Sequence, residues 1–159
     1  MTISFRWRNG NDVVFHRLYL QTEAYYNSLV GGICNRQDYV PHNLSESISD
    51  VIITYVDGTA AGCAGLKAYS KDTVEIKRVW VDETVRGNHI AEEMMARVET
   101  RALEQGYKKA ILQTRPQMEA AVSMYTKLEY GKIENYPPYD TYDKLDDAIC
   151  FAKILTHQL

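Results

Sequence analysis

Residues 86–91, which read RGNHIA, are the segment whose residue types and spacing are best suited to chemistry. They stand immediately before an expected helix over 90–105. The N-terminus of a helix leaves several backbone N–H groups unpaired and carries a partial positive charge, so a glycine-containing turn ahead of it forms a seat for phosphate. Arg86 adds a charged donor at the rim. The segment predicts an anion site, and an ordinary strand-to-helix connection is the alternative that this pattern leaves open.

Two familiar nucleotide-binding loops do not fit this segment. The chain contains no GxxxxGK[ST] sequence and no GxGxxG sequence. Both patterns depend on glycines and, in the first, on a lysine that reaches the phosphates. We therefore exclude a P-loop and a dinucleotide-binding loop, and look for a different class of phosphate-containing ligand.

An apolar strand and an amphipathic helix must position the segment. The apolar residues of 73–81 favour a central strand, and those of 90–105 form one stripe at helical spacing that ends near Gly106. A turn at Asp57-Gly58 is typical of a hairpin. The remaining pattern predicts strands at 3–8, 49–56, 60–69, 107–114, 130–134 and 148–155, and helices at 13–29 and 117–128. Together these elements predict one α+β domain over residues 1–159 with a mixed sheet.

Composition excludes several function classes. The chain has 159 residues, a net charge of −3, 45% hydrophobic and 25% charged residues, which are ordinary globular values and exclude a disordered or fibrous protein. Its mild acidity argues against nucleic acid as a partner, and no apolar run is long enough to span a membrane. Three widely spaced cysteines, Cys34, Cys63 and Cys150, indicate buried thiols rather than disulfides or a metal site. Because the first residues do not form a signal peptide, we expect a cytoplasmic protein.

The order of elements and the residues around segment 86–91 resemble the GNAT superfamily of acetyl-CoA-dependent N-acetyltransferases. That family carries Arg/Gln-x-x-Gly-x-Gly/Ala after a strand, and RGNHIA follows the strand end Val79-Trp80-Val81 here. A later match is Ala121-x-x-x-Tyr125-x-Lys127-Leu128. The resemblance covers residues 50–135 well and the whole chain loosely. It implies a mixed, mostly antiparallel central sheet, flanked by helices and splayed between its two central strands.

Four positions depart from the family pattern. His89 occupies the place of the central glycine, where glycine lets the backbone approach a pyrophosphate closely. His89 either tolerates that backbone conformation or shifts the phosphates, and its imidazole could donate to one of them. Met118 stands where the family has asparagine, and Glu129-Tyr130 replaces Gly-Phe. None of these departures removes a catalytic group.

The resemblance also implies the roles of individual residues. Acetyl-CoA is the expected co-substrate, and no metal is expected. Tyr125 matches the family's general acid, which protonates the departing thiolate, and Glu75 is the candidate base, acting through water. A backbone N–H of the strand 73–81 is expected to polarise the thioester carbonyl. The residues expected to bind the co-substrate are Val79, Trp80, Val81, Arg86, Gly87, Asn88, His89, Ile90, Ala91 and Glu92.

Without the resemblance, simpler interpretations apply to both catalytic candidates. A tyrosine on an amphipathic helix commonly packs in the core, and Glu75, close to Lys77 and Arg78, fits a salt-bridged strand residue. The leading hypothesis is an enzyme that acetylates a primary amine of a small molecule or an amino-acid-like substrate by direct attack. A non-catalytic acyl-CoA-binding sensor and a protein or peptide N-acetyltransferase are the alternatives.

The acceptor cannot be identified from the sequence. We expect its pocket between residues 20–45 and the loop 136–147, where four aspartates could attract a cationic amine or simply be solvated. The oligomeric state also stays open, and a homodimer would be ordinary because dimers are common in the superfamily. The four aspartates are Asp140, Asp143, Asp146 and Asp147.

Overall fold

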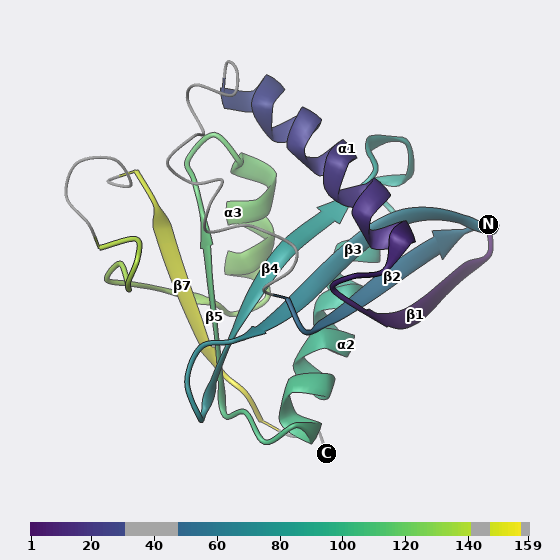
Figure 1. Cartoon of the computed structure of the whole chain (residues 1–159). Helices are drawn as coiled ribbons and strands as arrows, with labels where there is room; N and C mark the ends of the chain where they lie inside the picture. Colours follow the sequence, from purple (N-terminus) through teal and green to yellow (C-terminus); the bar gives the residue numbers. More distant parts are fainter. Residues whose placement is uncertain (31–47, 141–146, 157–159) are drawn as a thin grey trace.

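The computed structural model describes residues 1–30, 48–140 and 147–156. Its centre is a seven-stranded sheet in the order β1-β2-β3-β4-β5-β7-β6 (Figure 1). Every neighbouring pair is antiparallel except β4 and β5, which are parallel. The strands are β1 (Ile3–Asn9), β2 (Asp50–Val56), β3 (Thr59–Ala68), β4 (Thr73–Val81), β5 (Lys109–Thr114), β6 (Gly131–Ile133) and β7 (Ile149–Ile154).

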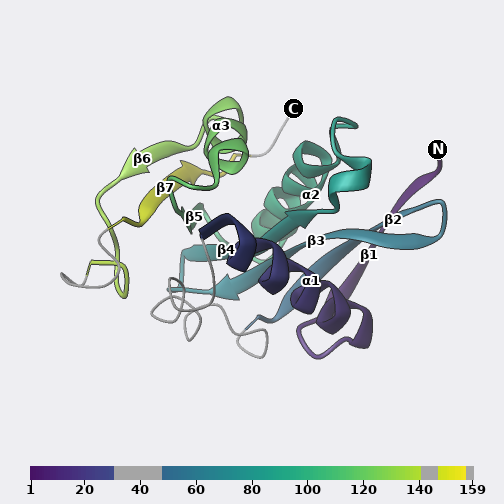
Figure 2. The same cartoon turned by 90° about the horizontal axis from the view of Figure 1, so that it is seen from above.

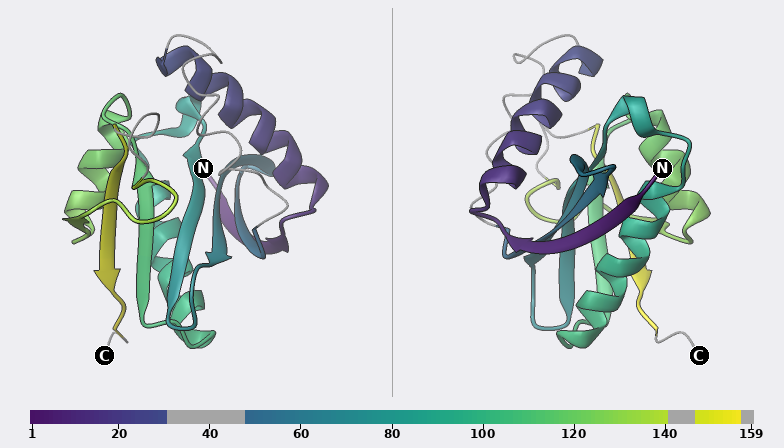
Figure 3. Two further views of the ribbon diagram at one scale, coloured as in Figure 1. Left: turned by 60° about the vertical axis from the view of Figure 1, so that its left-hand side comes forward. Right: turned by 90° about the vertical axis from the view of Figure 1, so that its right-hand side faces the viewer.

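Helices cover the two faces of this sheet. Figures 2 and 3 show α1 (Val13–Val30) on one face, and α2 (Ile90–Glu104) and α3 (Glu119–Lys127) on the other. Among the described residues, the core has three clusters of buried side chains. One joins the sheet to α2 and Tyr125 of α3, a second joins it to Phe15 and Leu18 of α1, and a third packs Tyr136 and Tyr139 against β5 and β7. The sheet therefore separates two layers of helices, and β4 contributes to the first two clusters.

Local sequence explains where the elements begin and end. Asp12 caps α1, because its carboxylate accepts hydrogen bonds from the N–H groups of Val14 at 2.9 Å and Phe15 at 3.2 Å. Asp57 and Gly58 both have positive φ, as a tight hairpin turn between β2 and β3 requires. The stripe predicted for α2 is buried against the sheet through Ile90, Met94, Met95, Val98 and Ala102.

The mixed fold with a mostly antiparallel sheet is confirmed. Each expected strand and helix is present, with ends that differ by a few residues from the prediction. Cys63 and Cys150 are buried free thiols, as expected, and Cys34 lies outside the described residues. Within the described ranges, none of the helices combines the length and apolar character that a membrane crossing needs.

Two irregularities of β4 matter for the site. Its pairing with β5 covers only Thr73–Glu75 against 109–111, although both strands continue. Its pairing with β3 slips by one residue, because Cys63 pairs with Trp80 whereas Gly65 pairs with Lys77. The slip is a bulge centred on Arg78, whose φ of 56° is unusual for a residue with a side chain.

Candidate active site

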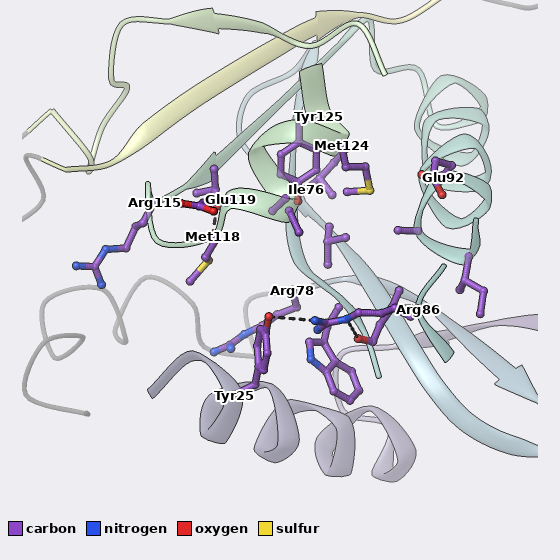
Figure 4. Close-up of a pocket in the computed structure, with 18 of the residues that line it drawn as sticks. Tyr25, Ile76, Arg78, Arg86, Glu92, Arg115, Met118, Glu119, Met124 and Tyr125 are labelled. Atoms are coloured by element: carbon purple, nitrogen blue, oxygen red, sulfur yellow. Dashed lines mark hydrogen bonds between the residues drawn. The ribbon is translucent and has the colours of Figure 1, made fainter. Parts of the chain in front are cut away.

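A cleft of about 490 Å³ opens where the β4–β5 ladder stops (Figure 4). This volume lies in the range of small-molecule and cofactor sites. The cleft is lined by the second half of β4, the turn before α2, the first turn of α2, the end of β5 and the start of α3. One end is thus a helix N-terminus, and the other end contains Tyr125 of α3.

The turn before α2 presents backbone to the cleft. Arg86, Gly87, His89 and the first residues of α2 line it. The first N–H bonded within the helix is that of Glu93, which donates to the carbonyl of His89 at 3.1 Å, so the N–H groups of 90–92 precede the helical ladder. Asn88 lies outside the lining, and its side-chain amide donates to the Val85 carbonyl at 2.8 Å, which holds the turn. The arrangement suits an anion.

This turn favours glycine because of its backbone conformation and not because a side chain would lack space. Gly87 has a φ of 86°, yet a Cβ atom added to it would meet nothing within 4 Å. His89 adopts the left-handed conformation, with a φ of 58°, at the position where the family motif has glycine. Its side chain is 88% exposed, with Nδ1 3.8 Å from Glu92. His89 therefore adopts the backbone conformation that glycine favours, with its side chain directed into solvent.

Arg86 reaches from this turn to the opposite helix. Its Nε donates to the Val81 carbonyl at 2.9 Å, and Nη1 donates to the Tyr25 hydroxyl at 3.1 Å. Its guanidinium also lies 4.7 Å from the centre of the Tyr25 ring. Figure 4 shows these two side chains meeting beside the cleft, so α1 and the phosphate-suited turn are directly linked.

Tyr125 occupies the other end of the cleft. It lies on α3, lines the cleft and is only 5% exposed. Its ring packs against Tyr130 and Phe151, with ring centres 5.9 Å apart in each case. This packing fixes the ring. A phenol held in this way can donate a proton to a group in the cleft.

Glu75 lies at the last β4–β5 pair and is outside the lining of the cleft. It is buried, and the Tyr136 hydroxyl donates to its carboxylate at 2.7 Å. Lys77, which does line the cleft, has its ammonium 3.6 Å from the same carboxylate and donates to the Tyr139 hydroxyl at 2.7 Å. Glu75 is therefore both an ion-paired strand residue and one member of a buried polar group whose Lys77 is adjacent to the bulge residue Arg78.

Burial shifts the proton affinities of this group. Desolvation lowers the pKa of Lys77 to about 8, an effect that the negative charge of Glu75 opposes. Desolvation also raises the pKa of Tyr136, and the neighbouring Glu75 carboxylate adds to that increase. Tyr136 consequently remains a protonated donor to Glu75 under ordinary conditions, whereas Lys77 can change charge under mildly alkaline conditions.

The acceptor region expected at 20–45 and 136–147 is only partly described. Tyr25 is the part of these two stretches that lines the cleft among the described residues. Asp147 is held by Arg115, whose Nε and Nη2 donate to it at 3.0 and 2.8 Å. Asp140 is exposed, and Asp143 and Asp146 lie outside the described residues. Asp147 thus anchors a cleft-lining arginine.

Most of the sequence-predicted binding residues come together at the cleft. Tyr125 does so as well, whereas Asn88 and Glu75 do not line the cleft, although residues next to them in the chain do. Sequence reasoning missed the bulge at Arg78, the link through Tyr25 and the tyrosine partners of Glu75. A charged residue inside an apolar strand was the available signal for Arg78. The predicted binding residues that line the cleft are Val79, Trp80, Val81, Arg86, Gly87, His89, Ile90, Ala91 and Glu92.

Comparison with known proteins connects this geometry to a family. The family model of the GNAT acetyltransferases matches residues 19–130, which include both ends of the cleft. Among curated proteins, no sequence matches the chain.

Solved structures share the whole fold at low sequence identity. A candidate acyl-CoA N-acyltransferase from Klebsiella pneumoniae has a TM-score of 0.78 and 20% identity, with 98% of this chain and 99% of that chain covered. PaiA N-acetyltransferase from Thermoplasma acidophilum, solved with coenzyme A, has a TM-score of 0.72 and 14% identity, with 97% and 99% covered. A GNAT family acetyltransferase from Elizabethkingia anophelis, solved with acetyl-CoA bound, has a TM-score of 0.69 and 18% identity, with 96% and 98% covered.

Proposed function

The chain belongs to the GNAT family of acetyltransferases, and we propose that it transfers the acetyl group of acetyl-CoA to a primary amine of a small molecule or an amino-acid-like substrate. The observation that carries this proposal is the cleft at the end of the β4–β5 ladder. It joins a helix N-terminus suited to phosphate with a buried tyrosine suited to proton donation. An acyl-CoA needs both, since its phosphates lie far from its thioester.

The phosphate end is assigned to the turn before α2. In the proposal, backbone N–H groups of 87–92 hold the pyrophosphate, and Arg86 lies beside it. The left-handed backbone at Gly87 and His89 supports this assignment, because it turns successive N–H groups toward one side. Trp80 and Val81 line the passage between the two ends, where the pantetheine arm would contact strand backbone left unpaired by β5.

The reaction end is assigned to the bulge and Tyr125. The Val79 N–H, which follows the left-handed residue Arg78, would donate to the thioester carbonyl and stabilise negative charge as the amine attacks. The new C–N bond forms, the C–S bond breaks, and the Tyr125 hydroxyl gives its proton to the departing sulfur. Burial of Tyr125 supports this role, because few water molecules could supply the proton instead.

Glu75 is assigned as the acceptor of the proton that the amine loses, acting through water. Its position outside the lining of the cleft supports an indirect rather than a direct transfer. The Tyr136 hydroxyl and Lys77 fix its carboxylate. A purely structural ion pair between Glu75 and Lys77 is the competing role, and Glu75→Gln separates the two by its effect on turnover.

The proposal also covers the domain organisation, the cellular location and the oligomeric state of the protein. We treat residues 1–159 as one catalytic domain, since a single sheet runs from β1 to β6. The free buried thiols Cys63 and Cys150 support a reducing, cytoplasmic setting. The proposed chemistry uses acetyl-CoA as co-substrate and no metal, and a homodimer is a state to test by light scattering.

The test is release of free CoA thiol from acetyl-CoA in the presence of primary amines of different classes. The classes are amino acids, aliphatic diamines and polyamines, amino sugars, and peptides with a free N-terminus. Turnover with a small amine supports the proposal, and turnover restricted to peptides supports a protein acetyltransferase. Tight CoA binding without turnover on any class would favour the non-catalytic sensor.

A further inference from the structure

The bulge of β4 is held by a residue that is ill suited to its own backbone conformation. Arg78 has a φ of 56°, a region that glycine occupies freely and residues with a Cβ occupy rarely. Its carbonyl oxygen accepts a hydrogen bond from the Cys63 thiol at 3.3 Å. Burial raises the pKa of that thiol to about 12, so the proton stays on sulfur. Something other than intrinsic preference must keep Arg78 in place.

The side chain of Arg78 supplies a tether to α1. It is 2% exposed, and Nη2 lies 2.5 Å from a carboxylate oxygen of Glu23. Its guanidinium also lies 4.0 Å from the centre of the Tyr19 ring. Tyr19 and Glu23 are four residues apart, so they are neighbours on one face of α1. A buried arginine held by a carboxylate and an aromatic ring is a rigid connection.

The tether ends at the part of the cleft where chemistry is proposed. Arg78 and the next residue, Val79, both line the cleft. The direction of the Val79 N–H depends on the backbone angles of Arg78, because the peptide plane joins the two residues. The contact of the Arg78 side chain with α1 can therefore determine the direction of the Val79 N–H in the cleft.

We propose that Glu23, with Tyr19, is a positioning residue that holds the β4 bulge through Arg78 and thereby aims the Val79 N–H at the reacting carbonyl. The inference rests on the proposed function. It adds that α1, the helix that carries Tyr19 and Glu23, controls the rate of acetyl transfer without touching the reacting atoms. Glycine at position 78 would adopt the bulge conformation without a tether. A glycine variant therefore shows whether Arg78 is needed to hold the backbone or acts directly through its guanidinium.

Three variants test the tether. Glu23→Ala removes the carboxylate. The matched control is Asp50→Ala, because Asp50 also pairs with an arginine that lies over an aromatic ring, but does not line the cleft: its carboxylate is 3.4 Å from Arg101, whose guanidinium lies 4.7 Å from the centre of the Trp7 ring. The double variant Glu23→Ala/Arg78→Gly removes the tether and the backbone conflict together. For each protein, we would measure kcat on an amine found in the screen and the Kd of CoA by calorimetry.

We expect Glu23→Ala to lower kcat by about 10-fold to 10²-fold, the loss that follows when a catalytic group moves by roughly 1 Å. The Kd of CoA should stay within about twofold, since the phosphate end is untouched. Asp50→Ala should keep the parent kcat, and the double variant should recover most of the lost turnover. Parent turnover in Glu23→Ala, equal losses in kcat and CoA affinity, or a double variant no better than Glu23→Ala would each overturn the inference.

A second readout needs no turnover and therefore separates this inference from the proposed function. The Val79 amide resonance in nitrogen–proton correlation NMR should move in Glu23→Ala and return toward the parent position in the double variant. If the parent protein transfers no acetyl group to any amine, the proposed function fails, yet this resonance still reports whether Glu23 sets the bulge. An unmoved Val79 resonance in Glu23→Ala would overturn the tether itself.

Discussion

The two ends of the cleft each contain a non-glycine residue in the left-handed conformation, but they hold it in opposite ways. At the reaction end, Arg78 is buried to 2% exposure and bound by Glu23 of α1. At the phosphate end, His89 has an 88% exposed side chain whose nearest ionic partner, Glu92, is 3.8 Å away. The backbone of Arg78 is therefore held through its side chain, whereas that of His89 is held by its place at the start of α2.

This difference separates two ways of building a site. Apart from the Arg86 guanidinium, the proposed phosphate end is made of backbone, so the other side chains there can vary provided that the turn keeps its conformation. The reaction end depends on buried side chains whose partners come from other elements, such as Glu75 with Tyr136. Side-chain deletions should therefore reduce turnover at the reaction end. At the phosphate end, backbone changes and the loss of Arg86 should reduce CoA affinity, whereas deletion of the other side chains should not.

The largest effect is expected for Tyr125→Phe. This change keeps the ring and its contacts with Tyr130 and Phe151 but removes the hydroxyl, so only proton donation is lost. We expect kcat to fall by about 10²–10⁴, as for other general acids, while the Kd of CoA is retained. Steady-state kinetics with thermal melts as a control measure this. A variant that keeps the parent kcat, with chemistry rate-limiting, would make Tyr125 a packing residue only.

Gly87→Val tests the phosphate end through the backbone. Valine disfavours the φ of 86°, and the resulting strain of about 1–2 kcal/mol should weaken CoA binding by a factor of about 5–30 in calorimetry. The matched control is Gly58→Val in the β2–β3 turn, where φ is 84° and a Cβ would again meet nothing within 4 Å. It should lose similar stability and keep its CoA affinity. Equal CoA affinity in the two variants would contradict the placement of the phosphates at this turn.

Lys77→Met tests whether Lys77, at the reaction end, is a buried cation with a lowered pKa. Folding lowers the pKa of Lys77 from 10.5 to about 8, so between these pH values the unfolded chain binds more protons and the stability of the parent rises with pH. The Tm of the parent relative to Lys77→Met should increase by a few degrees between pH 7 and about 10. Lys71→Met, at an exposed turn residue, is the control. A pH-independent difference would contradict a desolvated cation at this position.

The smallest effect is expected for His89→Gly. Glycine adopts the left-handed conformation readily, and the imidazole that is lost is exposed. CoA affinity should stay within about twofold of the parent value by calorimetry. A loss of tenfold or more would instead mean that the imidazole donates to a phosphate, so that the His89 side chain contributes to CoA binding.

The same contrast explains how much could be predicted from the sequence. The turn before α2 is a local feature, so a short run of residues indicated the helix start and the glycine-like backbone, and the proposed anion site rests on these two features. The strands followed from alternation of apolar residues and the hairpin from Asp57-Gly58. These signals all act between residues close in sequence.

The reaction end could not be predicted to the same depth, because its contacts are remote in sequence. Glu75 and Tyr136 are 61 residues apart, and Lys77 and Tyr139 are 62 apart. No local pattern reports such pairs, and the one-residue slip of β4 appears only when β3 and β4 are aligned in space. Sequence reasoning therefore reached Glu75 as a candidate but not the hydroxyl that holds it.

The division of labour between the two ends is tested most directly by comparing CoA with acetyl-CoA in nitrogen–proton correlation NMR of the parent protein. The two ligands share their phosphates and differ only at the thioester. We predict that amide resonances of 87–92 shift equally with both ligands, whereas the Val79 resonance shifts markedly with acetyl-CoA alone. Equal shifts of Val79 with both ligands, or no shifts at 87–92 with either, would contradict the account.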